Sequence, residues 1–172
     1  MSPRGARAHR STQLRHPPPA LQGHILAAHF VGDVHHSGTG VATDSEPARA
    51  AYKIAAEAGH AVSQYQVGLM YYNGLGVAVD YKQARPWLEK AAAQDQPNAS
   101  SGLGTMYYEG QGVAPSWCRA RVYYQRAIGL GDPKAVENMQ ILTEDIQNVS
   151  YTSRLFHHLP YRESSLIPLA LV

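Results

Sequence analysis

The histidines are the side chains of this sequence with the clearest capacity for chemistry, because imidazole binds metal ions and transfers protons near neutral pH. Five of the nine histidines lie between residues 24 and 60, and His157-His158 forms a further doublet. The single cysteine, Cys118, excludes a zinc site built from several thiolates. His24 and His60 also occupy equivalent places at predicted helix starts, which gives them a structural explanation. We therefore expect no metal and no cofactor.

The sequence contains no local motif for catalysis. It has no nucleophile elbow of the form G-x-S-x-G, no phosphate-binding loop and no H-E-x-x-H metalloprotease motif. A catalytic site assembled from residues distant in the sequence would leave no such trace. We expect a protein that is not an enzyme, with a hydrolase-like or metal-binding module as the less favoured alternative.

A repeat of 36 residues positions these side chains. Four columns of glycines recur at this interval and hold twelve of the fifteen glycines. The columns are Gly32, Gly68 and Gly104; Gly38, Gly74 and Gly110; Gly40, Gly76 and Gly112; and Gly23, Gly59 and Gly131, with Asp95 at the missing place in the last. Periods of this length are typical of helical repeat proteins.

Each repeat is predicted to form two helices. The first, from Asp80 to Gln94 in one copy, carries an apolar stripe at helical spacing, made of Ala84, Trp87, Leu88, Ala91 and Ala92. The second, from Ala61 to Asn73, contains Gly68, which costs about 1 kcal/mol relative to alanine inside a helix. We infer that a bulky residue of a first helix packs directly on this glycine. Pro86 is expected to kink or weaken its helix.

A tyrosine pair followed by a glycine-rich loop identifies the repeat type. The pattern comprises residues 55–61, Gln64-Tyr65, Gly68, Tyr71-Tyr72, Gly74-Leu75-Gly76-Val77, Asp80-Tyr81 and Ala84. It closely resembles the Sel1-like repeat, a relative of the tetratricopeptide repeat, over about residues 20–139. The resemblance implies an all-α fold, an α/α solenoid of helix pairs, and a role as an adaptor that assembles protein complexes. His35-His36 replaces the tyrosine pair in the first copy, and one cysteine does not fit the disulfide-rich bacterial branch of the family.

Three regions are expected along the chain. Residues 1–20 form a basic, proline-rich, disordered tail, residues 21–149 form the solenoid with a C-terminal capping helix, and residues 150–172 form an irregular extension. The repeat spacing places a first helix at about residues 8–22, where Pro17-Pro18-Pro19 opposes it. The helix at about His24 to His36 should therefore expose an uncovered face or fray. Either the chain is a truncated or regulatory form of a larger adaptor, or residues 1–19 cover that face.

The charge distribution argues against a protein that binds nucleic acid, and the hydropathy argues against a protein that spans a membrane. Four arginines and no acidic residue lie within residues 1–32, but they lack the interleaved aromatic residues that stack on nucleic acid bases. No apolar run approaches the roughly 18 residues that span a bilayer. We expect a cytoplasmic protein, with mitochondria, or the ER lumen if a signal is missing from this chain, as alternatives. The sequence does not indicate the oligomeric state of the protein.

A column of basic residues is the candidate binding site. Arg49, Arg85 and Arg121 each follow an alanine of a first helix by one residue. First helices line the concave face of tetratricopeptide-like solenoids, so the resemblance places these arginines along a groove, where guanidinium groups can bind the carboxylates of an acidic peptide. Neighbouring positions add Tyr81, Trp117, Lys53 and Glu89. We therefore predict a non-catalytic scaffold that binds a segment of another protein, against the alternative that these residues are only solvated helix faces.

Overall fold

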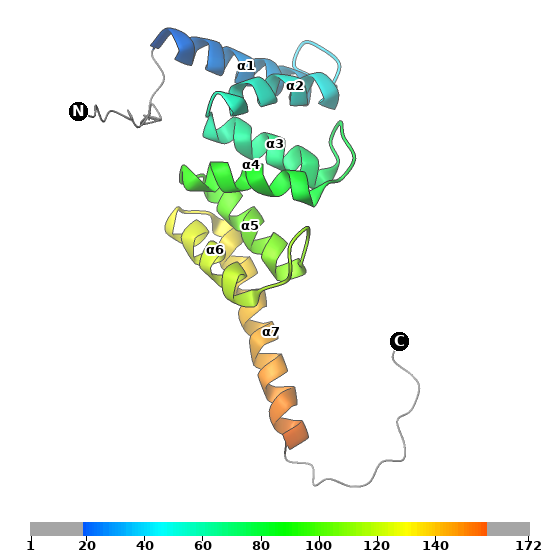
Figure 1. Cartoon of the computed structure of the whole chain (residues 1–172), viewed down its shortest axis with the longest axis vertical. Coiled ribbons are helices and arrows are strands. Elements are labelled where there is room, and N and C mark those ends of the chain that lie inside the picture. Colours follow the sequence, from blue (N-terminus) through cyan, green and yellow to red (C-terminus); the bar gives the residue numbers. More distant parts are fainter. Residues whose placement is uncertain (1–18, 158–172) are drawn as a thin grey trace, which may run out of the picture.

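The protein is a row of α-helices, and the part that the structure describes contains no strand. The computed structural model describes residues 19–157, with side chains for residues 21–149. The helices are α1 (Pro19–Ser37), α2 (Ser45–Glu57), α3 (Ala61–Asn73), α4 (Tyr81–Ala93), α5 (Pro97–Glu109), α6 (Trp117–Gly129) and α7 (Pro133–His157). Figure 1 shows them stacked in chain order from α1 at one end, with α7 projecting beyond the stack at the other. The predicted all-α solenoid is confirmed.

Local signals in the sequence determine where the helices begin and end. At the start of α4, Oδ1 of Asp80 accepts hydrogen bonds from the backbone N–H groups of Lys82 and Gln83, at 2.9 and 3.1 Å. Asp80 and Gln94 cap α4, and α3 spans the predicted residues 61–73. Asp95 adopts a φ of 59°, the left-handed conformation that Gly59 and Gly131 adopt in the neighbouring repeats. The helix boundaries predicted for these two copies are confirmed.

The interior glycines of the second helices receive bulky side chains from the next first helix. A Cβ atom on Gly104 would lie only 2.5 Å from Cδ1 of Tyr124, so any side chain at this position would clash. The same contact occurs in three successive repeats, between Gly32 and Tyr52, Gly68 and Leu88, and Gly104 and Tyr124. The three bulky residues are at most 2% exposed. The close approach inferred from the glycine column is confirmed.

A second interface joins the two helices within each repeat. In the α2 and α3 pair, small residues of α2 such as Ala48 and Ala56 pack with Tyr52 against Val67 and Met70 of α3. The α4 and α5 pair repeats this arrangement with Leu88, Ala91 and Ala92 against Ala99, Leu103 and Met106. Each first helix therefore contacts a second helix on both sides, and this alternation builds the continuous core.

Both ends of the described chain differ from the predicted boundaries. Helix α1 already begins at Pro19, because proline is well tolerated at the first helical position. Helix α7 continues to His157, so residues 150–157 are helical rather than irregular. Between Pro133 and Pro160 the sequence contains neither glycine nor proline to end the helix. The predicted disorder of residues 1–18 and the rest of the C-terminal extension lie outside the described residues.

Helix α4 contains a proline that was expected to kink or weaken it. Pro86 lies inside α4, yet the helix continues through it from Tyr81 to Ala93, with Ala84 and Leu88 buried on its inner face. Pro86 itself is exposed, so packing against both neighbouring helices holds α4 together despite the lost backbone hydrogen bond.

Among the described helices, none is long and apolar enough to cross a membrane.

Replacing an interior glycine tests the contact between repeats. We expect Gly104→Ala to lower the free energy of unfolding by about 1–3 kcal/mol, because the added methyl group must displace the buried Tyr124 ring. Urea unfolding followed by circular dichroism measures this change.

Gly23→Ala in α1 is the matched control, because a Cβ there meets no atom within 4 Å. This substitution should leave stability unchanged or raise it by up to about 1 kcal/mol through better helix propensity. Equal stability of the two variants would contradict the proposed packing role of Gly104.

Candidate functional site

The three arginines of the predicted column lie on successive first helices but have different surroundings. The guanidinium carbon of Arg49 lies 6.0 Å from the centre of the Tyr71 ring, within reach of a cation–π interaction. Nη1 of Arg85 lies 3.4 Å from Oε1 of Glu89, one turn further along α4. Arg121 is exposed and forms no ion pair with the described residues. Tyr71 lies beside Arg49, but the residue at the equivalent position for Arg121, two repeats later, is Thr143.

Two arginines of the column retain unused hydrogen-bonding capacity. The Nε atoms of Arg49 and Arg85 are buried and have no acceptor among the described residues. Both side chains are half-buried overall, so their stems are held by packing while the rest of each guanidinium group reaches the surface. This shared feature distinguishes Arg49 and Arg85, but not Arg121, from ordinary solvated arginines.

The other charged residues of the candidate site form weak intrahelical pairs. Nζ of Lys53 lies 3.8 Å from Oε1 of Glu57, and both side chains are about half exposed. The pair between Arg85 and Glu89 has the same spacing of four residues and similar exposure. Pairs of this kind contribute only about 0.3–0.5 kcal/mol, so a partner's charged groups could replace them at little cost.

The two predicted aromatic residues also help to build the fold. The Tyr81 ring packs edge-on against Tyr72, with 5.2 Å between the ring centres. A Cβ atom on Gly112 would lie 2.7 Å from Cβ of Tyr81, so the loop after α5 rests directly on this residue. Trp117 is half-buried against the cluster that contains Tyr107 and Tyr124. Tyr81 and Trp117 are therefore partly buried, and each packs against other aromatic residues.

A second basic and aromatic surface, which the sequence did not predict, lies between α5 and α6. Tyr107 and Tyr123 stack with their ring planes 7° apart, and the guanidinium carbon of Arg119 lies 5.3 Å from the centre of the Tyr107 ring. Together with Cys118 and the exposed Val122 they line a shallow hollow of about 400 Å³. The stacking joins α5 to α6. In the sequence, only Val122, an apolar residue at a helix position that faces solvent, could have indicated this surface.

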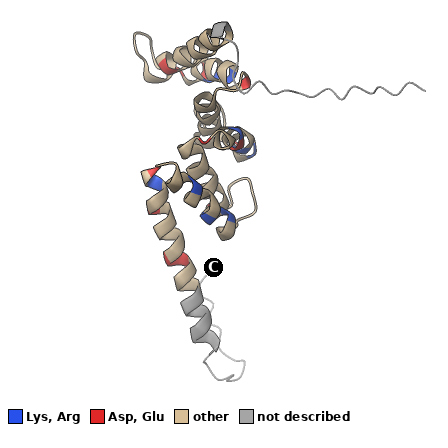
Figure 2. Ribbon diagram, turned by 90° about the vertical axis from the view of Figure 1, so that its left-hand side faces the viewer, with Lys and Arg blue, Asp and Glu red and all other residues tan. Residues whose placement is uncertain are grey.

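Basic and acidic positions are distributed unevenly over the molecule. Figure 2 shows Lys and Arg on the middle helices of the stack, whereas the projecting helix α7 is mainly uncharged in its described part. The described residues of α7 up to 149 include one lysine, Lys134, and the acidic residues Glu137, Glu144 and Asp145. Most of the basic residues that the structure describes therefore lie on the repeats, where acidic residues also occur.

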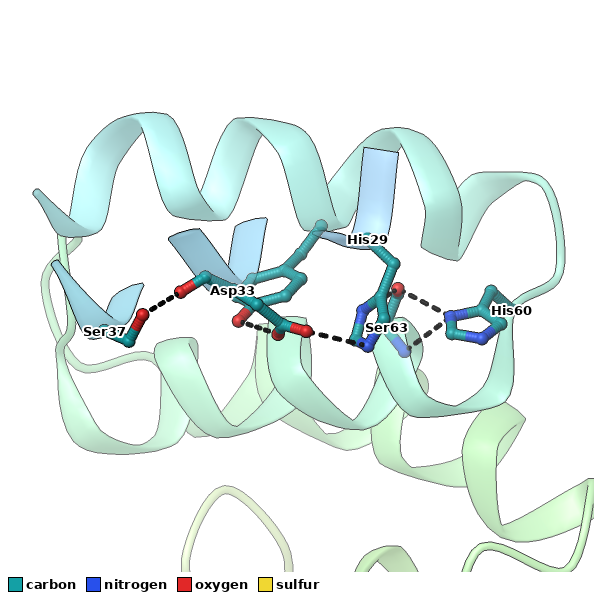
Figure 3. Close-up of polar contacts among 6 residues, drawn as sticks. His29, Asp33, Ser37, His60 and Ser63 are labelled. Carbon is teal, nitrogen blue, oxygen red and sulfur yellow. Dashed lines mark hydrogen bonds and ion pairs between the residues drawn. The ribbon is translucent and has the colours of Figure 1, made fainter. Parts of the chain in front are cut away.

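His29 and His60 belong to a polar network between α1, α2 and α3 (Figure 3). Oγ of Ser63 lies 3.0 Å from Nδ1 of His29 and 2.8 Å from Nδ1 of His60. Nε2 of His29 lies 3.5 Å from Oδ2 of Asp33, and the Tyr52 hydroxyl donates a 2.7 Å hydrogen bond to Oδ1 of the same carboxylate. The network thus links three helices through polar side chains.

This network places a serine, a histidine and an aspartate in the order of a hydrolase triad, but its geometry does not suit catalysis. Ser63 is fully buried, so a substrate cannot reach its hydroxyl group. The same hydroxyl is shared between two imidazoles, and Asp33 is also engaged by Tyr52. Burial and the adjacent Asp33 carboxylate raise the pKa of Tyr52, so its hydroxyl remains a donor. Among the described residues, no group of three or more potential metal ligands converges.

His60 has a capping role that depends on its protonation state. Its Nδ1 accepts a hydrogen bond from the backbone N–H of Ser63 and so caps the start of α3. Burial, and then the nearby His29 ring, lower the pKa of His60, although Asp33 acts in the opposite direction. The His29 and His60 ring centres are 4.7 Å apart. The folded protein therefore favours neutral His60.

Comparison with known proteins extends these observations. The family model described as the Sel1 repeat matches residues 25–60, 61–96 and 97–132. These three segments follow the repeat of 36 residues and contain α2 to α6 completely. No curated protein shows a significant match to the chain.

Three solved structures show the same architecture. A Sel1 repeat protein from Oxalobacter formigenes is 32% identical with a TM-score of 0.65, covering 72% of this chain and 51% of its own. Protein c5321, a protective antigen of uropathogenic Escherichia coli, is 34% identical with a TM-score of 0.64, covering 67% of this chain and 25% of its own. The chain thus spans about half and a quarter of these two proteins. Cysteine-rich protein B of Helicobacter pylori, at 22% identity and a TM-score of 0.56 over 69% of this chain and 90% of its own, shares the fold.

The capping role of His60 predicts a pH dependence of stability. Because the pKa of His60 is lowered below its ordinary value of 6.5 in the folded protein, the unfolded chain binds this proton first as the pH falls. The contribution of His60 to stability is therefore present at pH 7 and decreases towards pH 5. We expect His60→Asn, which keeps a capping acceptor but does not titrate, to weaken the pH dependence of the unfolding free energy in this range.

His24→Asn provides the control, because it removes one exposed histidine of α1 without touching the cap. Thermal or urea unfolding at several pH values compares the variants. A His60→Asn variant with the same pH dependence as the native chain would show that this histidine does not couple protonation to folding.

Proposed function

Because the chain belongs to the Sel1 repeat family, whose members are generally scaffolds for protein interactions, we propose that it is a non-catalytic scaffold that binds a partner protein. The binding surface is the concave face formed by the first helices α2, α4 and α6. The ligand that fits the charge of this surface is an acidic peptide segment. The observation that carries the proposal is the column of arginines on these helices.

The hydrogen-bonding state of the column supports binding of carboxylates. A guanidinium group has five N–H donors, and the Nε donors of Arg49 and Arg85 have no acceptor among the described residues. Arg121 is exposed, and the pair between Arg85 and Glu89 is solvent-accessible. Carboxylates of a partner can therefore engage the terminal nitrogens of these side chains without first breaking a strong interaction.

The half-buried aromatic residues support the same surface. Tyr81 and Trp117 are fixed by packing before any partner arrives, so little side-chain entropy is lost when they contact one. Tyrosine, tryptophan and arginine are the residue types that contribute most to binding energy in protein interfaces. Lys53 adds a further positive charge on α2. The surface thus combines rigid aromatic edges with adaptable charged groups.

Removing the arginine column tests the proposal. We expect replacement of Arg49, Arg85 and Arg121 by alanine to weaken binding of fluorescein-labelled, glutamate-rich peptides at least tenfold, since a hydrogen bond to a charged group contributes roughly 1.5–3 kcal/mol. Binding to the native chain should also weaken as salt is added, because the interaction is electrostatic. Fluorescence anisotropy measures both effects, and the unfolding midpoint of the variant should stay close to that of the native chain.

The control removes the same number of positive charges elsewhere, by replacing Lys90, Arg126 and Lys134 with alanine. This variant should retain the affinity of the native chain for the acidic peptides. Loss of affinity in both triple variants would mean that only the net charge attracts the peptide. Retention of affinity by the arginine variant would refute the proposed site.

A further inference from the structure

Helix α1 presents apolar side chains that no described element covers. Phe30 is 67% exposed, Leu26 is 56% exposed and Val31 is 46% exposed. The equivalents of Val31 in the next two repeats, Val67 and Leu103, are 0% exposed. Among the described residues nothing covers Val31, and the repeat shows what covers its equivalents.

In the complete repeats, this face contacts the first helix of the same repeat. Val67 and Met70 of α3 pack against α2, and Leu103 and Met106 of α5 pack against α4. Helix α1 keeps apolar residues at all the corresponding positions, namely Ala27, Val31 and Val34. The uncovered face thus corresponds to the second-helix side of the interface within each repeat. The described residues do not include a first helix that packs against it.

The preceding residues of this chain do not carry the pattern of a first helix. The repeat spacing aligns Thr12 with Ala48 and His16 with Tyr52, so polar residues stand at two positions of the apolar stripe. Pro17 and Pro18 then directly precede Pro19, the first residue of α1, and disfavour a first helix that runs through these positions. The sequence therefore favours another protein, rather than these residues, as the source of a helix that completes the interface.

The opposite end of the described array also exposes apolar side chains, such as Ile141, but its helix lacks the glycine of the other second helices. Each complete junction between repeats requires a glycine in the second helix, as Gly68 and Gly104 show. The corresponding residue of α7 is Gln140, which is exposed and carries a side chain where the other second helices have none. A helix can therefore join the array in the manner of the repeats at α1 but not at α7.

We propose that the uncovered face of α1 binds an amphipathic helix of another protein. The fitting helix has small residues at positions i, i+7 and i+8 and a bulky residue at i+4, which is the stripe formed by Ala48, Ala55, Ala56 and Tyr52 in α2. The segment from Pro19 to Gly32 contains no Lys, Arg, Asp or Glu, so apolar contact dominates the binding. This surface is distinct from the arginine column, and its ligand has a different chemistry.

A synthetic peptide with the sequence of residues 44–58 is a suitable probe, because it contains the stripe of α2. We expect the fluorescein-labelled peptide to bind the full chain saturably and with little dependence on salt. Val31→Glu in the full chain should weaken this binding at least tenfold, since it places a charge in the centre of the apolar face. A peptide carrying Ala48→Glu should bind at least tenfold more weakly to the native chain, for the same reason.

Ile54→Glu is the matched control variant, because Ile54 is 64% exposed on α2 and lies away from the α1 face. The chain with this substitution, and the chain lacking the three arginines, should both bind the probe like the native chain. Loss of binding in the arginine variant would assign the peptide to the other surface and overturn the proposal.

Two further results would overturn it. The first is absence of binding, or equal binding by the native chain and the Val31→Glu variant. The second is a dimer in analytical ultracentrifugation that Val31→Glu converts to a monomer, because a second copy of the chain would then cover α1. A monomeric native chain that binds the probe through Val31 supports the proposal.

Discussion

The contact between a helix glycine and a bulky side chain of the next repeat controls the geometry of the whole array. Because Gly32, Gly68 and Gly104 lack a Cβ atom, Tyr52, Leu88 and Tyr124 reach the helix backbone directly. The helices can then approach closely enough to exclude water along their length. Each glycine costs about 1 kcal/mol in helix propensity, and burial of a large side chain offsets this cost. The arginine column and the apolar face of α1 both depend on the stacking that this contact enforces.

The first of these contacts carries an additional polar constraint. Tyr52 packs on Gly32 and also donates a hydrogen bond to Asp33, the residue next to that glycine. Asp33 lies near His29, which connects through Ser63 to the start of α3. Such a satisfied network holds α1 in one orientation although the described residues cover only one side of this helix. The position of α1, and so of its uncovered face, is therefore well defined.

The chemistry of the two proposed surfaces follows from their places in the repeat. The arginine column lies beside the junction of two helices within a repeat, where packing holds the stems and leaves the ends of the guanidinium groups at the surface. The face of α1 is a core interface with one helix absent from the described residues, so its side chains are apolar and uncharged. A single scaffold can thus combine a salt-sensitive surface for an acidic segment with a salt-insensitive surface for a helix.

The sequence by itself determined the period of the repeat, the family, the bounds of most helices and the role of the interior glycines, because these depend on local signals and on spacing along the chain. Asp80, for example, caps the helix that directly follows it, and its residue type predicts this. The surroundings of the candidate site required the tertiary structure. Tyr81 packs beneath a loop about thirty residues away, and Arg121 lacks the aromatic neighbour of Arg49. The histidine network likewise joins residues of three helices, because packing of the helices, rather than proximity in the chain, decides which side chains meet.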